Sequence, residues 1–225
     1  MKVLPSQLSA SGYRLLETLS FNELPNWLKA QLKKKTAASR WFVAFNVLFS
    51  LFFFGLASYY YHTELFQMRK LISFFFLGFA ASFLLIPVHE YLHVFAYRQL
   101  GCTHTRISAD WKRFMFLAEA HQFVVNYQEF RKVALAPFVV ISSGLLLAGF
   151  FVSPATQLLL LSTNLVHASF CAGDFGLLSY FQSVGTKQLV TFDDSEKRQT
   201  EFWLKEETSA LSQPEANPLE ATSNV

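Results

Sequence analysis

Long stretches without a charged residue constrain most strongly what this chain can fold into. Residues 41–61 contain no Asp, Glu, Lys or Arg, nor do 71–88, and the longest such stretch, 133–173, runs for 41 residues. A helix needs about 20 apolar residues to cross a bilayer. The longest stretch is therefore expected to hold two spans, separated at Ser153-Pro154. This pattern predicts a multi-pass membrane protein with about four transmembrane helices.

The composition agrees with a membrane protein and argues against a soluble enzyme. Hydrophobic residues make up 52% of the chain and charged residues 16%, against about 25% charged in an ordinary soluble domain. The formal net charge of +3 is only mildly basic, so no nucleic-acid partner is expected. Two cysteines, Cys102 and Cys171, cannot build a disulfide scaffold.

The distribution of Lys and Arg predicts the orientation. Seven basic residues precede the first span, two lie in the following loop at 62–70, and five lie in the loop at 102–132. Cytoplasmic loops carry the excess of Lys and Arg. We therefore expect a protein of the cytoplasmic membrane with both termini and the 102–132 loop in the cytosol. The first span starts too late and is too long to be a cleaved signal peptide.

The chain divides into three predicted regions. Residues 1–40 form a cytosolic leader, either amphipathic helices on the membrane surface or a solvated segment, because leucines recur there at helical spacing. Residues 41–182 form the four-span domain, with spans at 41–61, 71–88, roughly 133–152 and 155–180. Residues 183–225 form a polar cytosolic tail, with disorder expected from Gln213 to Val225.

The predicted fold class is all-α, with one short exception. Residues 106–109 and 122–125 alternate apolar and polar side chains, which favours two strands of a β-hairpin-like cytosolic insertion between spans two and three. Such a hairpin could hold an extended peptide by adding it as a further strand. A plain connector is the alternative interpretation.

Chemistry is concentrated at the end of the second span, in the run His89-Glu90-Tyr91-Leu92-His93. This is the HExxH pattern, in which two His at i and i+4 share one face of a helix and can bind one metal ion. Glu90 lies about 100° away around the helix, where its carboxylate can address water at the metal. The sequence therefore predicts His89 and His93 as Zn²⁺ ligands and Glu90 as the catalytic residue. The alternative is a set of polar side chains at the membrane interface.

A catalytic zinc site usually needs a third protein ligand. Span four carries Asn164, His167, Cys171 and Asp174 along one narrow stripe of an otherwise apolar helix. Asp174 lies about 28 Å from the outer end of its span and His89 about 27 Å from the outer end of its own, at 1.5 Å per residue. We therefore predict Asp174 as the third ligand, in preference to His167 or His121. Polar contacts between helices are the alternative role for the stripe.

Several segments resemble one protein family. They are Val88–His93, Gly101, Ala118–His121, Leu135–Phe138, Asn164 and Ala172–Asp174. Together, over roughly 85–190, the chain is similar to the DUF3267 family of zincin-type peptidases, bacterial integral membrane proteins distantly similar to site-2 proteases. The resemblance implies a metal-dependent intramembrane peptidase. It also implies His89, His93 and Asp174 as metal ligands and Glu90 as the catalytic acid and base. His104 and His121 are expected to be surface histidines, although His121 matches a family position.

The leading functional hypothesis is a zinc peptidase that cuts membrane proteins or peptides near the cytosolic face of the bilayer. Hydrolysis of another substrate, such as a lipid or a small amide, is the enzymatic alternative. A membrane regulatory or assembly factor with a structural metal site is the non-enzymatic one. The substrate and the oligomeric state do not follow from the sequence.

Overall fold

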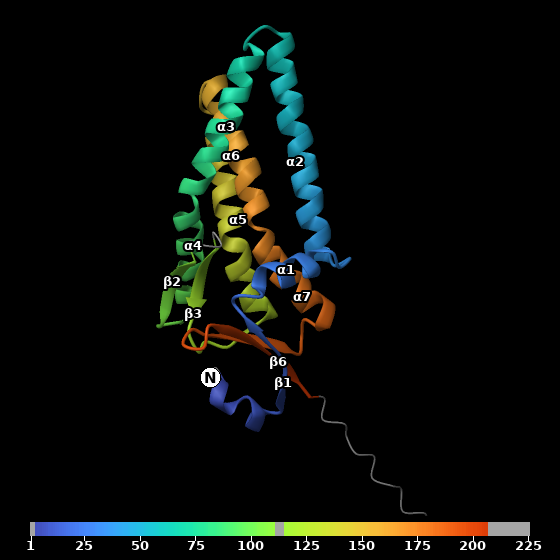
Figure 1. The fold of residues 1–225 in the computed structure, drawn as a ribbon, viewed down its shortest axis with the longest axis vertical. Coiled ribbons are helices and arrows are strands. Elements are labelled where there is room, and N and C mark those ends of the chain that lie inside the picture. The colour runs from blue at the N-terminus through green and yellow to red at the C-terminus, as the bar shows by residue number, and fades with distance from the viewer. Residues whose placement is uncertain (1–2, 111–114, 207–225) are drawn as a thin grey trace, which may run out of the picture.

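The computed structural model describes residues 3–110 and 115–206, which form an upright bundle of helices with small sheets at one end (Figure 1). Two short 3-10 helices, η1 (Pro5–Gln7) and η2 (Ser9–Ser11), open the described chain. The α-helices of the described residues are α1 (Leu24–Leu32), α2 (Ala37–His62), α3 (Met68–Leu84), α4 (Ile86–Gln99), α5 (Tyr127–Gly149), α6 (Pro154–Phe170) and α7 (Ala172–Val184).

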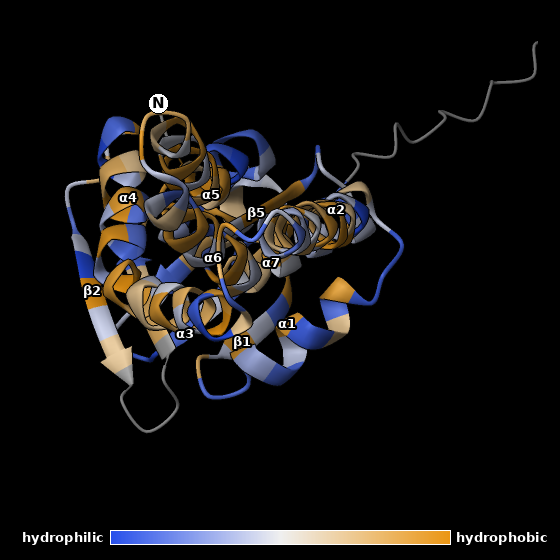
Figure 2. Ribbon diagram, turned by 90° about the horizontal axis from the view of Figure 1, so that it is seen from above, coloured by the Kyte–Doolittle hydropathy of each residue, from blue (hydrophilic) through white to orange (hydrophobic). Residues whose placement is uncertain are grey.

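Helices α2 and α5 are each long and apolar enough to cross a membrane. The other predicted spans are bent pairs, α3 with α4 and α6 with α7, each bent by 40°. The described chain thus has two candidate spans, or up to four if each bent pair counts as one. Only 11% of the apolar window of α2 is buried, which suits a helix whose sides face lipid. Figure 2 shows apolar residues dominating the bundle helices.

The first break falls where a proline disturbs the helix. Pro87 lies at the start of α4, where it lacks an N–H and crowds the carbonyl four residues earlier. The first bent pair therefore turns at Leu85, close to the predicted end of span two at Val88. The second pair turns at Cys171, whose backbone leaves the helical range, and Asp174 follows in the first turn of α7. Ser153 caps α6 and Pro154 begins it, at the break predicted within the longest uncharged stretch.

The described chain is mostly helical, as predicted, but outside the bundle it also contains a four-stranded sheet that was not expected. Strands β1 (Tyr13–Ser20), β6 (Gln199–Lys205), β5 (Leu189–Asp194) and β4 (Val125–Asn126) form one sheet in that order. Neighbouring strands run antiparallel. The pairing of β1 with β6 joins strands that lie far apart in the sequence. A local sequence pattern does not predict so distant a partner.

This sheet corrects the interpretation of both terminal regions. The 1–40 leader contains strand β1 as well as one short helix, α1, and the residues of the tail up to 205 include β5 and β6. Phe21 and Phe202 of these regions are almost fully buried in the main hydrophobic core. The disorder expected at 213–225 falls outside the described residues.

A second, two-stranded sheet lies between α4 and α5 in the chain. It pairs β2 (Thr105–Asp110) with β3 (Met115–Ala120), so that Arg106 lies opposite Glu119. The first strand predicted at 106–109 overlaps β2. The second, predicted at 122–125, is wrong, because the partner strand ends at Ala120 and only Val125 joins a strand, in the other sheet. Pairing with β2, which a local sequence pattern does not contain, decides where the partner strand lies.

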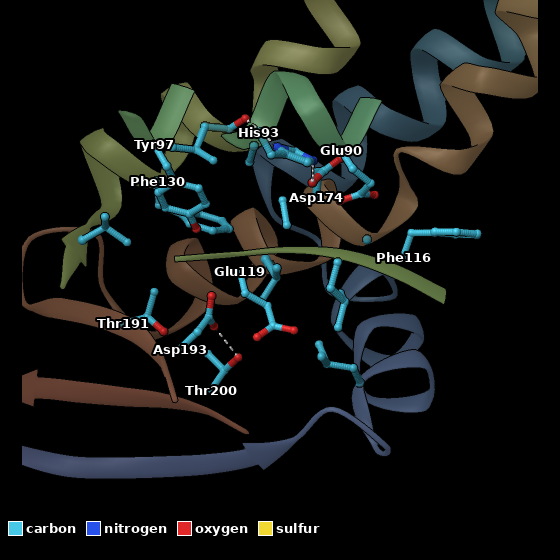
Figure 3. Close-up of a pocket in the computed structure, with 18 of the residues that line it drawn as sticks. Glu90, His93, Tyr97, Phe116, Glu119, Phe130, Asp174, Thr191, Asp193 and Thr200 are labelled. Carbon is cyan, nitrogen blue, oxygen red and sulfur yellow. Dashed lines mark hydrogen bonds and ion pairs between the residues drawn. The ribbon is translucent and has the colours of Figure 1, made fainter. Parts of the chain in front are cut away.

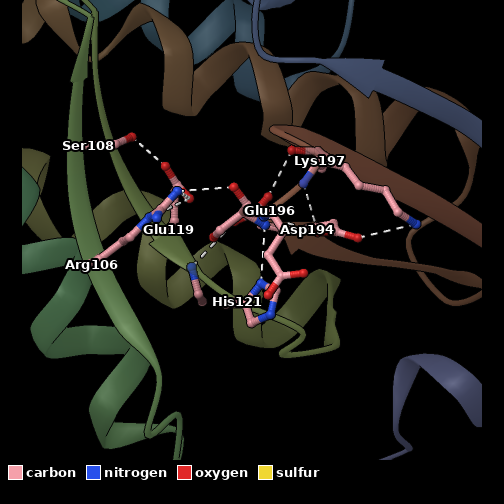
Figure 4. A network of polar contacts seen from close by, with 11 residues as sticks. Arg106, Ser108, Glu119, His121, Asp194, Glu196 and Lys197 are labelled. Atoms are coloured by element: carbon pink, nitrogen blue, oxygen red, sulfur yellow. Dashed lines mark hydrogen bonds and ion pairs between the residues drawn. The ribbon is translucent and has the colours of Figure 1, made fainter.

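Polar contacts attach this hairpin to the four-stranded sheet (Figure 4). Glu119 is 1% exposed, and its carboxylate accepts hydrogen bonds from Ser108 and from Arg106 Nε at 3.1 Å. Arg106 also donates to the Ser195 carbonyl at 3.1 Å. His121 Nδ1 accepts from the Ser195 backbone N–H at 3.2 Å. These contacts hold β3 against the turn between β5 and β6.

Helix α1 packs tightly on α7 and so helps to place the residues of that helix. A Cβ at Gly176 would lie 3.2 Å from the Leu28 carbonyl oxygen, so the two helices cross at close range. Ser179 Oγ donates to the Gln31 carbonyl at 2.8 Å. Asp174 lies two residues before Gly176, so the position of α1 bears on that of the Asp174 carboxylate.

Candidate metal centre

The two histidines of the HExxH motif lie on one face of α4, one turn apart. Their Nε2 atoms are 3.1 Å from each other. Both side chains are buried together with Glu90, and none of the three residues is more than 9% exposed. Burial of two histidines and a glutamate is costly unless the three groups have partners.

Asp174 faces both histidines from the first turn of α7. Its Oδ1 lies 3.1 Å from His93 Nε2, and its Oδ2 lies 3.4 Å from His89 Nε2. The bend after α6 brings this aspartate to the level of α4. The structure thus brings together the three side chains that the sequence predicted as ligands.

The spacing of these atoms fits a zinc ion. Zinc binds His nitrogen and carboxylate oxygen at about 2.0–2.2 Å in tetrahedral geometry, so its ligand atoms lie about 3.3 Å apart. The separations of 3.1, 3.1 and 3.4 Å match that spacing. Two neutral imidazoles and one carboxylate supply the donor set of a catalytic site, which keeps its fourth position open.

The far side of each imidazole also has a partner. His93 Nδ1 lies 3.0 Å from the Val133 carbonyl oxygen of α5. His89 Nδ1 lies 3.2 Å from His167 Nε2 of α6. A neutral imidazole with its proton on Nδ1 keeps a lone pair on Nε2. Both contacts therefore suit rings that present Nε2 to a metal.

The Glu90 side chain lines the same cavity as His93 and Asp174 and lies beside strand β3. The backbone of Ala118 in that strand is a hydrogen-bonding neighbour of the Glu90 carboxylate. In Figure 3, Glu90, His93 and Asp174 lie on one side of β3, and Glu119, Asp193 and Thr200 lie on the other. Successive side chains of a strand point to opposite faces, so Ala118 and Glu119 face different parts of the site.

A cavity of about 180 Å³ adjoins the metal-site residues. Apolar side chains of several elements form much of its wall, and carboxylates lie at both ends. Its lining includes His93, Glu90, Asp174, Tyr97, Phe123, Phe130, Glu119 and Asp193. A second, more apolar cavity of about 390 Å³ shares His89 and Glu90 and is bounded by Leu24 and Leu28 of α1, Phe83, Ile86 and Phe170. The site therefore borders both an acidic and an apolar space.

Asp193 lines the first cavity, at the end farther from the metal-site residues, and its carboxyl has an unusual pKa. Burial raises the pKa of this carboxyl to about 6, against the hydrogen bonds that it accepts from Thr200 and from the Ala120 backbone. The Thr200 hydroxyl donates to Asp193 Oδ1 at 2.8 Å. The pKa of the neighbouring Asp194 shifts in the opposite direction. Backbone N–H groups at Lys197 and Glu196, together with the Lys197 charge, lower its pKa.

The remaining residues of the predicted stripe divide into two groups. His167 and Cys171 come close to His89 and form a second possible ligand group with it. Asn164 is buried without a hydrogen-bond partner among the described residues. His121 lies at the hairpin, where it contacts Ser195, and it joins neither ligand group found among the described residues. His104 lies there too, its carbonyl accepting from His121 N–H.

Three neighbours of the site were not expected from the sequence. The Val133 carbonyl is a backbone atom, and Ala118 contributes through its backbone, so neither has a side-chain signature. Asp193 belongs to a segment that was interpreted as a polar tail. The alternation of Val190 and Phe192 with Thr191 and Asp193 was the one available sign of a strand there.

Comparison with known families agrees with this geometry. Residues 82–189 match the model of the DUF3267 family, whose description is "Putative zincin peptidase". The match confirms the family resemblance that the sequence motifs indicated over roughly 85–190. It spans α4, the β2–β3 hairpin, α5, α6 and α7 and ends at the first residue of β5. Neither the curated proteins nor the solved structures include a match.

Proposed function

We propose that this protein is a zinc-dependent peptidase that hydrolyses peptide bonds within the membrane or beside its cytosolic face. The observation that carries the proposal is the convergence of His89 Nε2, His93 Nε2 and an Asp174 carboxylate oxygen at zinc-ligand spacing. The adjacent Glu90 supplies a carboxylate of the kind that a hydrolytic metal site uses. The family match supports zinc and peptide hydrolysis.

His89, His93 and Asp174 would hold the ion. When bound, zinc lowers the pKa of a coordinated water to about 7 and polarises the carbonyl that is attacked. Glu90 takes the proton from the attacking water on its carboxylate. The same carboxylate then passes that proton to the nitrogen of the departing amine. The Ala118 backbone beside Glu90 orients the carboxylate for both transfers.

The surroundings favour an extended peptide as substrate. Strand β3 runs beside Glu90, and a strand next to the reacting groups can hold a peptide by backbone hydrogen bonds. The apolar cavity bounded by Leu28, Phe83 and Phe170 suits a hydrophobic side chain at membrane depth. The excess of basic residues before span one supports a cytosolic location of both termini.

The test is Glu90→Gln in the full-length protein, purified in detergent with zinc. The substitution keeps the size of the side chain and removes the base, so zinc content and thermal unfolding should stay those of the wild type. Cleavage of membrane-protein or peptide substrates should fall by at least about 100-fold. A Glu90→Gln protein that cleaves as fast as the wild type would overturn the proposed role.

Two other outcomes would favour the alternative functions. Wild-type hydrolysis of lipid esters or small amides without cleavage of any peptide would identify a different metallohydrolase. A zinc-loaded wild type and a Glu90→Gln variant that support the same cellular phenotype would indicate a structural metal in a regulatory or assembly factor.

A further inference from the structure

Pro137 removes the regular hydrogen-bond donor of the Val133 carbonyl. It lies buried inside α5, four residues after Val133. In an α-helix each N–H donates to the carbonyl four residues earlier, but proline has no N–H, and its ring crowds that carbonyl. The Val133 oxygen is the atom that lies 3.0 Å from His93 Nδ1. The backbone partner of a metal-site histidine is therefore a carbonyl that its own helix cannot use in the ordinary way.

We infer that Pro137 is a positioning residue of the metal site, which acts through the Val133 carbonyl to orient His93. The carbonyl, pushed off the helix axis, accepts the proton on His93 Nδ1 and thereby leaves Nε2 for the metal. The inference rests on the metal site of the proposed function and does not depend on which bond the protein hydrolyses.

The proposed role predicts opposite effects on the helix and on the metal. A proline within a helix interior weakens that helix, so an alanine at position 137 should strengthen the metal-free protein. The same alanine brings back an N–H for the Val133 oxygen and lets that carbonyl return toward the helix axis, away from His93. A merely structural proline would not link a gain in stability to a loss of zinc affinity.

The experiment compares Pro137→Ala with Gly144→Ala in the full-length protein. Gly144 lies in the same helix, and a Cβ there would meet nothing within 4 Å, so this control strengthens α5 without touching a histidine. Both variants should raise the unfolding temperature of the metal-free protein. Only Pro137→Ala should weaken zinc binding, by about tenfold, the lower end of what losing an outer partner costs.

Wild-type zinc affinity in Pro137→Ala would overturn the inference. So would an equal loss of affinity in Gly144→Ala, because the effect would then belong to the stiffness of α5. A Pro137→Ala protein that loses both zinc affinity and metal-free stability would also count against it. If the wild type itself binds no zinc, the proposed function fails together with this inference. The other outcomes contradict only the role of Pro137 and not the metal site.

A separate contact assigns His167 as the positioning residue of the other histidine. His167 is 1% exposed, and its Nε2 lies 3.2 Å from His89 Nδ1, while His89 Nε2 faces Asp174 at 3.4 Å. His167 Nε2 therefore accepts the His89 proton, and His89 keeps its Nε2 lone pair for the metal. A neutral His89 cannot offer a lone pair at both nitrogens, so the group with His167 and Cys171 does not hold a second ion beside the first.

Two substitutions at His167 separate the hydrogen bond from the packing. His167→Phe keeps a ring without an acceptor and should weaken zinc binding about 10- to 100-fold. His167→Gln places an oxygen near the position of Nε2 and should recover most of that affinity. Ser162→Ala is the control, because the hydroxyl of this buried serine of α6 donates to the Phe74 and Phe75 carbonyls of α3. This substitution should leave zinc binding unchanged.

Cobalt substitution supplies a second measurement. The visible spectrum of the cobalt-loaded protein should change in His167→Phe and return toward that of the wild type in His167→Gln. An unchanged affinity and spectrum in His167→Phe would overturn the assignment, as would equal losses in the Phe and Gln variants. A thiolate-to-cobalt absorption band in the wild type, lost in Cys171→Ala, would show instead that His167 and Cys171 ligate the ion. If His167→Phe does not fold, Gln is compared with His167→Asn, whose oxygen falls short of Nε2.

Discussion

Asp174 Oδ2 lies 3.4 Å from His89 Nε2, although each residue belongs to the second half of a different bent helix pair. His89 follows the turn at Leu85, and Asp174 follows the turn at Cys171. Both breaks therefore stand at the level of the candidate metal centre. In a straight helix these side chains would continue in the direction of the preceding turns. Each bend instead turns the last part of its helix pair, so that His89 and Asp174 face each other.

The first prediction concerns the third metal ligand. Asp174→Ala should lower zinc affinity by at least about 100-fold, because it removes a ligand and the negative charge that offsets the ion. His121→Ala should retain full zinc occupancy, since that side chain contacts Ser195 and lies outside both ligand groups found in the described part of the chain. Metal analysis of the two purified variants checks this. Full occupancy in Asp174→Ala would disprove the ligand assignment.

The second prediction concerns orientation. Seven Lys and Arg residues precede the first span and two follow it, which favours a cytosolic N-terminus, and an even number of spans returns the C-terminus to the same side. Alkaline phosphatase fused to the C-terminus should be inactive, and green fluorescent protein fused there should fluoresce. The reverse pattern would mean that the span count or the orientation is wrong.

The third prediction concerns the packing of α3 on α6. A Cβ added at Gly78 would lie 1.6 Å from Ser162 Oγ and 2.9 Å from the Leu159 carbonyl oxygen, and the backbone atom cannot move away easily. Gly78→Ala should therefore destabilise the protein by about 1–3 kcal/mol. Gly55→Ala is the matched control, since a Cβ at Gly55 meets nothing within 4 Å. Thermal unfolding in detergent should show a lower midpoint for Gly78→Ala alone.

The fourth prediction concerns Asp193 and pH. The pKa of its carboxyl rises to about 6 in the folded protein from an ordinary value near 3.8, chiefly through burial, with Glu119 raising it further and His121 lowering it. A carboxyl whose pKa is raised in the folded state contributes to stability. This contribution is fully present below the pKa of the unfolded state, and it is lost as pH rises through about 6. Asp193→Asn keeps an acceptor for Thr200 and cannot ionise. It should therefore be more stable than the wild type at pH 7.5, by about 1–3 kcal/mol.

Denaturant unfolding at pH 4, 6 and 7.5 measures this difference. The stability advantage of Asp193→Asn should be largest at pH 7.5 and should shrink toward pH 4. Asp194→Asn is the comparison, because hydrogen bonds and the Lys197 charge lower the pKa of that neighbouring carboxyl. An advantage of Asp193→Asn that does not vary with pH would contradict the raised pKa.

The membrane character, the family resemblance and the pair of metal-binding histidines could be predicted from the sequence alone. These are local properties. Uncharged runs of about 20 residues define spans by length, and the i, i+4 spacing places His89 and His93 on one face of any helix. Asp174 could be predicted from its depth along its span, because the rise per residue of a helix is constant. In the structure its Oδ1 lies 3.1 Å from His93 Nε2.

Tertiary structure alone decided everything that depends on contact between distant segments. The pairing of β1 with β6 joins the two ends of the described chain, and pairing with β2 placed the second hairpin strand at Met115–Ala120. The Val133 carbonyl meets His93 through a backbone atom, and His167 turned out to face the far side of His89. Such contacts depend on how helices cross and strands register. These arrangements are set by the packing of many side chains at once, and no single window of sequence contains them.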